Sequence, residues 1–217
     1  MAEYALTATS TEAPAGTFYD KIAGLYDLTF KVNGYGRSLD QYFRDYPLPL
    51  SPGARVLDAG CGTGLLTLAL LRALSFPVSI TAIDLSGSSV AKAKKAVYES
   101  SYLATQVSFM QGNVLSLPFA DASFDLIVTS GMLEYLPLEA GLDELARVIT
   151  PRGHLLNLPI RPSVASTVLE LMFRFKAHPP AEVDEKTRRH FRVVNHYRFP
   201  PLQAIGWTKT AVLAQKF

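Results

Sequence analysis

Three glycines at alternate positions, with an aspartate ahead of them, form the strongest chemical signal in this 217-residue chain. The segment Asp58-Ala59-Gly60-Cys61-Gly62-Thr63-Gly64 follows a short apolar run and precedes a run of helix formers that starts at Leu65. A strand that ends in a glycine turn and leads into a helix brings bare backbone and a helix N-terminus together, which suits a nucleotide-like ligand. A dinucleotide fingerprint would require Gly or Ala at position 65, so the spacing disfavours a nicotinamide cofactor.

Two polar residues after later apolar runs supply further groups for such a ligand. Asp84 ends one run, and Asn113 follows the next. Ligands in an open α/β sheet bind beyond the carboxyl ends of the strands, so both side chains should lie near the glycine turn. A carboxylate can accept hydrogen bonds from both hydroxyls of a ribose, and an amide can hydrogen-bond an adenine edge. Alone, Asp84 could be a helix cap and Asn113 a turn residue; together they favour an adenosine-containing ligand.

Alternating strands and helices must position these residues. Apolar and alternating runs predict strands at residues 55–58, 77–84, 106–110, 124–128 and 154–159. Helical periodicity predicts helices at residues 64–75, 88–100 and 138–149. Pro151-Arg152-Gly153 reads as a helix stop and turn before the fifth strand. This alternation predicts an α/β fold with a Rossmann-like, doubly wound, mostly parallel sheet.

The flanking segments extend this core. Residues 1–16 read as a flexible tail, and helices at 18–27 and 38–46 would form an N-terminal helical lid or a purely packed cap. After the fifth strand we expect an apolar helix at 163–175 and a basic segment at 181–198. The run 207–215 could pair with 191–197 as an antiparallel C-terminal hairpin. We therefore divide a single domain, 17–217, into parts: a cap (17–50), a cofactor core (51–160), an acceptor-side insert (161–206) and a terminal strand (207–217).

Composition limits the classes of function. Apolar residues make up 48% of the chain and the net charge is +2, which fits a compact core and argues against a dedicated nucleic-acid surface. Cys61 is the single cysteine, so no intramolecular disulfide can form, and inside the glycine turn it reads as a small spacer. We find no secretory leader, metal-ligand pattern or membrane-spanning run, and we expect a soluble, cytoplasmic protein.

The motifs together resemble a known family. Val56–Gly64 is similar to the first motif of class I S-adenosylmethionine-dependent methyltransferases, and Ala82–Ser86 to the second. Gly112-Asn113-Val114, Ser130–Leu136 and Glu144–Val148 resemble the later ones. In detail the core is most similar to the ubiquinone/menaquinone-biosynthesis-type (methyltransferase type 11) subgroup.

The resemblance implies S-adenosyl-L-methionine as the cofactor. Asp84 would bind the ribose, Asn113 the adenine, Gly60 the methionine end, and Tyr19 would close over the ligand. The full expected set of cofactor-binding residues is Tyr19, Tyr26, Asp58, Gly60, Cys61, Gly62, Asp84, Leu85, Gly112, Asn113, Val114, Ser130 and Gly131.

Methyl transfer from a sulfonium is an in-line displacement that depends mainly on positioning, and a general base is needed only if the acceptor must lose a proton. Glu134, His190 and His196 are the candidate bases, although Glu134 could equally be an exposed helix start. His154 is excluded because it begins the fifth strand, at the opposite edge of the sheet.

The acceptor should be a small, largely apolar or aromatic molecule, because the cap and the insert are rich in Tyr, Phe, Leu and Met. Residues 161–206 depart from the usual pattern of the subgroup, so its quinone acceptor does not carry over. Residues 174–198 carry seven Lys/Arg against three Asp/Glu, which also fits an anionic lipid or membrane surface as a peripheral contact. A lipid methyltransferase, a non-catalytic S-adenosylmethionine-binding regulator and, last, a dehydrogenase remain as alternatives. For the apolar helix at 163–175 we favour a core or dimer-packing helix over a membrane anchor.

Overall fold

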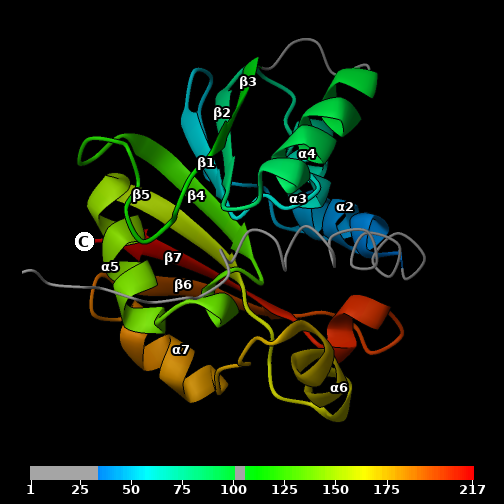
Figure 1. The fold of residues 1–217 in the computed structure, drawn as a ribbon. Helices are drawn as coiled ribbons and strands as arrows, with labels where there is room; N and C mark the ends of the chain where they lie inside the picture. Colours follow the sequence, from blue (N-terminus) through cyan, green and yellow to red (C-terminus); the bar gives the residue numbers. More distant parts are fainter. Residues whose placement is uncertain (1–33, 101–105) are drawn as a thin grey trace, which may run out of the picture.

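A seven-stranded sheet with the strand order β3-β2-β1-β4-β5-β7-β6 forms the centre of the protein, whose computed structural model describes residues 34–100 and 106–217 (Figure 1). The strands are β1 (Arg55–Ala59), β2 (Ser79–Asp84), β3 (Gln106–Gln111), β4 (Phe124–Ser130), β5 (Ile149–Leu158), β6 (Phe191–Arg198) and β7 (Thr210–Lys216). Strands β1 to β5 are parallel, whereas β7 runs antiparallel to both β5 and β6. The predicted Rossmann-like sheet and the antiparallel C-terminal pair are confirmed.

One face of the sheet is covered by α2 (Tyr35–Asp45), α3 (Leu65–Ala73) and α4 (Gly87–Glu99), together with the short helix η2 (Ala204–Trp207). Helix α2 begins three residues before the predicted helix and ends ahead of a proline-rich stretch, as expected. Its residues Leu39, Tyr42 and Phe43 are all buried. The Tyr42 ring lies 5.1 Å from that of Tyr197 on β6, so aromatic packing holds α2 against the far edge of the sheet.

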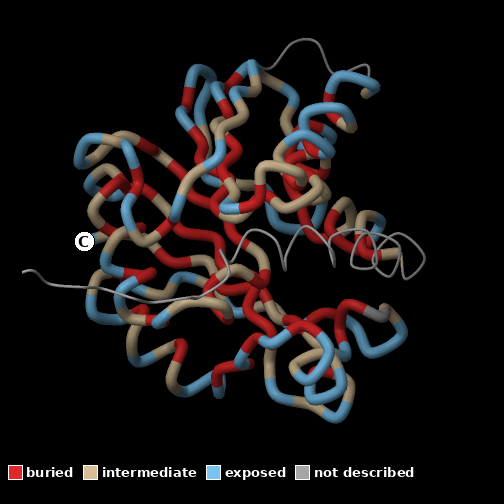
Figure 2. Tube along the Cα trace, viewed as in Figure 1, coloured by how far each residue is buried: buried red, intermediate tan, exposed pale blue. Residues whose placement is uncertain are grey.

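The opposite face is covered by α5 (Leu138–Val148) and α7 (Pro180–Thr187). Leu138, Leu142 and Leu145 of α5 recur at helical spacing and are buried on the sheet. The two groups of helices bury apolar side chains against opposite faces of the sheet (Figures 1 and 2). Because both faces are covered, the ends of the strands are the place for a ligand. The strand order reverses between β1 and β4, and ligands of open α/β sheets bind at such a point.

The predicted turn at Pro151-Arg152-Gly153 is wrong in part, because β5 runs through these residues. Phe124 of β4 pairs with Ile149, but Leu126 pairs with His154, so the register shifts between them. Arg152 has a φ of 64°, which is uncommon for a residue with a side chain. The turn residues therefore form an irregularity inside the strand instead of a loop before it.

Helix α6 (Val164–Phe173) has a capped N-terminus but is not a core helix of this chain. Ser163 and Ser166 form a capping box, and Phe173 is buried. In contrast, Val164 is 89% exposed and Leu171 is 86% exposed. The interpretation of α6 as a core helix is therefore wrong for these side chains, and its interpretation as a dimer-packing helix stays a prediction.

The expected tail at 1–16, the expected helix at 18–27 and both Tyr19 and Tyr26 lie outside the described residues. Within the part of the chain that is described, no helix has the length and apolar character needed to cross a bilayer.

Candidate functional site

The glycine loop joins β1 to α3 and is attached to the end of β2. Gly60, Gly62 and Gly64 have φ angles of 73°, 52° and 89°, a region that side-chain-bearing residues rarely adopt. The backbone N–H groups of Gly60 and Cys61 donate to the carbonyl oxygen of Ile83 at 2.8 and 3.0 Å. The alternate glycine spacing thus allows a turn that no other residue type could follow without strain.

The three glycines serve different purposes. A Cβ at Gly60 would lie 2.5 Å from the Cβ of Met132, and one at Gly64 would lie 3.1 Å from Ala93, so both positions are closed by packing. A Cβ at Gly62 would meet no atom of the described residues within 4 Å. Among the residues that the structure describes, the backbone at Gly62 therefore has open space above it, which allows the close approach of a ligand.

Asp84 connects this loop to the start of α4. Its Oδ2 accepts a hydrogen bond from the Gly62 N–H at 2.8 Å, and its Oδ1 accepts one from the Ser86 N–H at 2.9 Å. The cap of α4 is Ser86, whose side chain accepts from the Ser89 N–H at 3.1 Å, so Asp84 is not needed as the helix cap. Each oxygen of a carboxylate can accept more than one hydrogen bond, and Asp84 lies half-buried at the end of β2.

Asp58 lies beneath the loop and is fully buried. Its Oδ2 accepts a hydrogen bond from Thr67 Oγ1 at 2.5 Å, which fastens β1 to α3. The pKa of Asp58 is raised to about 7, mainly by burial; the Thr67 hydrogen bond opposes the rise, and the charge of Asp84 adds to it. Burial also raises the pKa of the Cys61 thiol far above its usual range, which agrees with the interpretation of Cys61 as a spacer.

The end of β3 supplies the polar and apolar groups on the other side of the loop. The Gly112 N–H donates to the Asp84 carbonyl at 2.9 Å, which holds the two strand ends together. Asn113 is exposed, and its Oδ1 accepts from the Leu115 N–H at 2.9 Å, so its orientation is fixed by a local turn. Leu85 is 39% exposed beside Asp84, and Val114 is buried. Leu85 and the Asn113 amide therefore directly follow Asp84 and Gly112 at these two joined strand ends.

The end of β4 contains a buried charged network that the sequence did not predict. Lys209, at 2% exposed, donates from Nζ to Ser130 Oγ at 3.1 Å and to the Leu158 carbonyl at 3.3 Å. The Tyr35 hydroxyl shares a 2.5 Å hydrogen bond with the same Ser130 oxygen. A Cβ on Gly131 would lie 2.9 Å from Lys209 Nζ, so the glycine makes room for the ammonium group.

Glu134 belongs to this network and is not an exposed helix start, which corrects one of the two interpretations from sequence. It is 4% exposed on the short helix η1 (Leu133–Tyr135), and its Oε1 accepts from the Ile160 N–H at 2.5 Å. Burial raises the pKa of Glu134, and the nearby Lys209 charge opposes that rise. Burial lowers the pKa of Lys209 to about 8, and Glu134 opposes that change in turn.

The two histidine candidates lie away from Glu134. His190 precedes β6 and contacts Asp143 Oδ1 at 2.7 Å. Because β6 runs in the same direction as β5, its first residues lie at the amino-terminal edge of the sheet, the edge for which His154 was excluded. His196 lies further along β6, 3.0 Å from Asp184 on α7.

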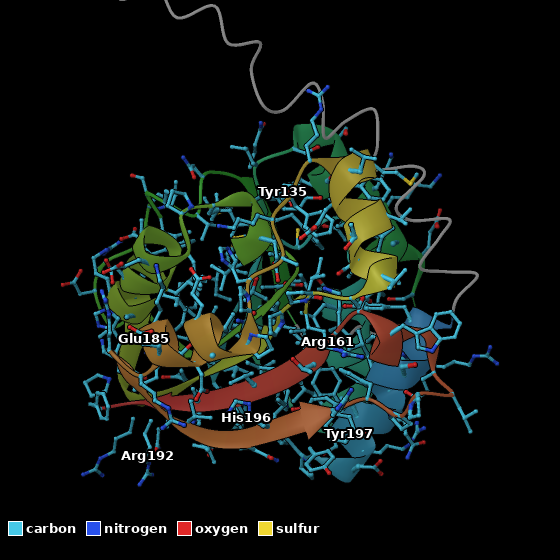
Figure 3. The ribbon with its side chains drawn as sticks, turned by 90° about the horizontal axis from the view of Figure 1, so that it is seen from below. Tyr135, Arg161, Glu185, Arg192, His196 and Tyr197 are labelled. Atoms are coloured by element: carbon cyan, nitrogen blue, oxygen red, sulfur yellow. The ribbon has the colours of Figure 1, made fainter. Side chains whose placement is uncertain are left out.

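His196 lines an open pocket at the β6 edge, whose position can be followed from the labels of Arg161, His196 and Tyr197 (Figure 3). The buried His178 and Ile160 also line it. Ile160 connects this pocket to the buried network through its N–H bond to Glu134. The three candidate bases are therefore not brought into one site.

Comparison with known proteins defines the class. The family model described as "Methyltransferase domain" matches residues 56–153, the segment that holds the glycine loop and the strand ends. Geranyl diphosphate C-methyltransferase from Streptomyces coelicolor, solved with Mg²⁺, geranyl diphosphate and S-adenosyl-L-homocysteine, superimposes with a TM-score of 0.71 at 13% identity. The match covers 95% of this chain and 100% of that one. The protein is a class I methyltransferase, an enzyme whose cofactor is S-adenosyl-L-methionine.

Two relatives define the group within that class. The ubiquinone/menaquinone biosynthesis C-methyltransferase of Geotalea daltonii is 34% identical over 144 residues, which span 64% of this chain and 60% of that protein. The demethylmenaquinone methyltransferase of Corynebacterium glutamicum is 30% identical over 196 residues, or 87% of this chain and 79% of that protein. The chain belongs to the ubiquinone/menaquinone-biosynthesis-type methyltransferases.

Proposed function

We propose that this enzyme methylates a ring carbon of a quinone-type aromatic acceptor. The sequence argued against this acceptor because residues 161–206 depart from the pattern of the subgroup. The relation to the Corynebacterium protein covers 87% of the chain and therefore extends into that segment, which favours the quinone-type acceptor after all. A ring of this kind is small and largely apolar, as the composition of the cap and insert suggests.

The contact that carries the cofactor assignment is the hydrogen bond from the Gly62 N–H to Asp84 Oδ2 at 2.8 Å. It fixes a carboxylate, whose oxygens can each accept more than one hydrogen bond, beside the backbone of Gly62. We assign Asp84 to the ribose hydroxyls, and the Asn113 amide and the Leu85 side chain to the adenine. The resemblance implied Gly60 for the methionine end; we assign that end to Gly62 instead, because Met132 packs against Gly60. When bound, the cofactor supplies a methyl group already activated on a sulfonium.

The chain's own part in the in-line displacement is to hold the acceptor in line and to exclude water. We assign the acceptor to the region next to Ser130 and Gly131, where β4 ends and Lys209 and Tyr35 fix the Ser130 hydroxyl. Of the candidate bases we retain Glu134, because it follows this strand end and is the only one of the three that belongs to the network around it. A hydroxyl on the ring must lose its proton for the ring carbon to become nucleophilic, and a carboxylate with a raised pKa suits that step.

Titration calorimetry with S-adenosyl-L-homocysteine tests the cofactor site. Asp84→Asn keeps the size of the side chain but removes its charge, so it should weaken binding by about ten-fold or more, since a hydrogen bond to a charged group is worth about 1.5–3 kcal/mol. Asp125→Asn is the matched control, because Asp125 interacts with Arg55 at the start of β1. Equal affinity in Asp84→Asn and the unchanged protein would refute the assignment.

Turnover with a panel of hydroxylated naphthoquinols and benzoquinols tests the acceptor, with mass spectrometry locating the new carbon–methyl bond. Methylation at oxygen or nitrogen only would refute C-methylation. Cofactor binding without turnover on any acceptor would instead favour the non-catalytic regulator. Glu134→Gln should lower kcat with little change in KM if Glu134 is the base.

A further inference from the structure

Two neighbouring segments, α6 and the connection from β6 to β7, carry large apolar side chains that are half or more exposed. They are Val164, Val168, Leu171, Met172, Leu202 and Trp207, and we call this set the α6–η2 patch. Helix α6 lies beside η2 in both ribbon views (Figures 1 and 3). Arg161 joins the two segments, because its side chain donates to the Gly206 carbonyl at 2.7 Å and its N–H to the Thr208 carbonyl at 2.8 Å.

The patch is not a by-product of a poorly formed helix. The capping box of Ser163 and Ser166 stabilises the start of α6 without help from burial, and Phe173 fixes its end in a small core. The exposed side chains range from 50% exposed at Met172 to 98% at Leu202. Soluble proteins rarely expose apolar side chains in such a group unless another surface covers them.

The charges around the patch favour an anionic surface. Arg174 and Lys176 follow α6 directly and are exposed. The nearest acidic residue along the helix, Glu170, is turned into the fold, since its Oε1 accepts from the Ala177 N–H at 2.6 Å. Two exposed basic side chains and one half-buried acidic side chain therefore lie at this end of α6, and their formal charges sum to a positive value.

Arg174 and Lys176 belong to the basic segment 174–198 that first suggested a membrane surface, and the part of it around α7 is a weaker candidate. Lys186 lies within 4 Å of both Glu139 and Glu182, and Arg188 forms an ion pair with Asp184 at 3.0 Å. Arg189 also pairs with Glu139. These charges are largely balanced on α5 and α7, away from the exposed apolar side chains.

Trp207 completes the set of groups found at a membrane–water interface. Its Nε1–H donates to the Pro201 carbonyl at 2.7 Å, so the polar atom is satisfied while the ring remains 56% exposed. Exposed aliphatic side chains, an indole ring and nearby basic side chains are the groups that place a protein among anionic lipid head groups. We propose that the α6–η2 patch docks the enzyme onto an anionic bilayer surface.

This docking would also serve an apolar acceptor, because α6 follows β5 at the edge of the sheet where the strand ends lie. The proposal does not rest on the identity of the acceptor, and its test uses neither cofactor nor acceptor. Trp207 is the single tryptophan of the chain, so its fluorescence reports on the patch itself.

The test is titration of the full chain with vesicles of phosphatidylcholine alone or with added phosphatidylglycerol, followed by fluorescence and co-sedimentation. We expect a blue shift of Trp207 and pelleting with the anionic vesicles, both reduced by high salt. The double variant Val168→Glu/Leu171→Glu should bind about ten-fold more weakly or worse. Val194→Glu is the matched control, since Val194 is 52% exposed on β6 and lies outside the patch, and it should bind like the unchanged chain.

Absence of both the shift and the pelleting would overturn the proposal, as would undiminished binding by the double variant. A lipid-free dimer that shields Trp207 and is broken by the same substitutions would assign the patch to a second copy of the chain instead. Because Val168 and Leu171 are exposed, the variant should keep its melting temperature; should it fail to fold, Leu171→Ser replaces it and must show the same direction of change.

Discussion

The buried Lys209 makes a quantitative prediction about stability and pH. Its pKa is about 8 in the folded chain against an ordinary value of 10.5, so between these pH values the unfolded chain binds a proton that the folded chain does not. Stability must therefore rise with pH across this interval. At about 1.4 kcal/mol per pH unit, the 2.5-unit difference gives a gain of about 3 kcal/mol in the free energy of unfolding.

The assay is urea unfolding at a series of pH values for the unchanged chain and for Lys209→Met. The substitution removes the titrating group, whereas other lysines and tyrosines titrate in both proteins and cancel in the comparison. The difference between the two curves should grow by about 3 kcal/mol from pH 8 to pH 10.5. If the free energies of unfolding of the two proteins change in parallel with pH, the pKa of Lys209 is not lowered by burial in the folded chain, and the argument is refuted.

Glu134 provides the second half of that test. Its carboxylate favours the charged form of Lys209, so Glu134→Gln should lower the lysine pKa further. The rise in stability should then begin at lower pH than in the unchanged chain. A rise that begins at the same pH would show that the two groups do not interact.

Two further predictions concern the glycine loop. Gly60→Ala should lower the free energy of unfolding by about 1–3 kcal/mol, because its Cβ would lie 2.5 Å from the Met132 side chain in a left-handed backbone conformation. Gly62→Ala should weaken binding of S-adenosyl-L-homocysteine more than it lowers stability, because its Cβ would meet no described neighbour. Thermal melts and calorimetry on both variants check this, and a larger stability loss for Gly62→Ala would contradict it. Cys61 should react with alkylating reagents only on unfolding, because burial raises the pKa of its thiol; rapid stoichiometric labelling of the native protein would disprove this.

The glycine loop and its link to Asp84 could be predicted because they depend on local rules. Left-handed φ angles require glycine, and parallel strands bring their carboxyl ends to one edge, so Gly60, Gly62 and Asp84 were found from spacing alone. The same rule excluded His154, but the fifth strand begins at Ile149, so His154 lies inside β5 and not at its start as predicted. The doubly wound pattern was enough for these inferences, and the exact order of the strands in the sheet was not needed.

The buried network could not be predicted, because it depends on contacts between distant segments. Lys209 reaches Ser130 only because β7 lies beside β5, and nothing in the run Thr208-Lys209-Thr210 marks its lysine as buried. Glu134 was ambiguous for the same reason, since its partner is the backbone of Ile160. For α6 the core interpretation was wrong, because apolar composition indicates that a surface is covered but not by what, and no part of the described chain covers Val164 or Leu171.

The position of β7 also determines the order in which the sheet can be assembled. β7 follows β6 in the sequence but lies between β5 and β6 in space, with no pairing between those two strands. During synthesis on the ribosome, β5 therefore emerges with an unpaired edge, and β6 has no strand to join until β7 appears. Because open edges invite pairing with other chains, insertion of β7 should be the step at which a nascent chain either completes its sheet or requires a chaperone.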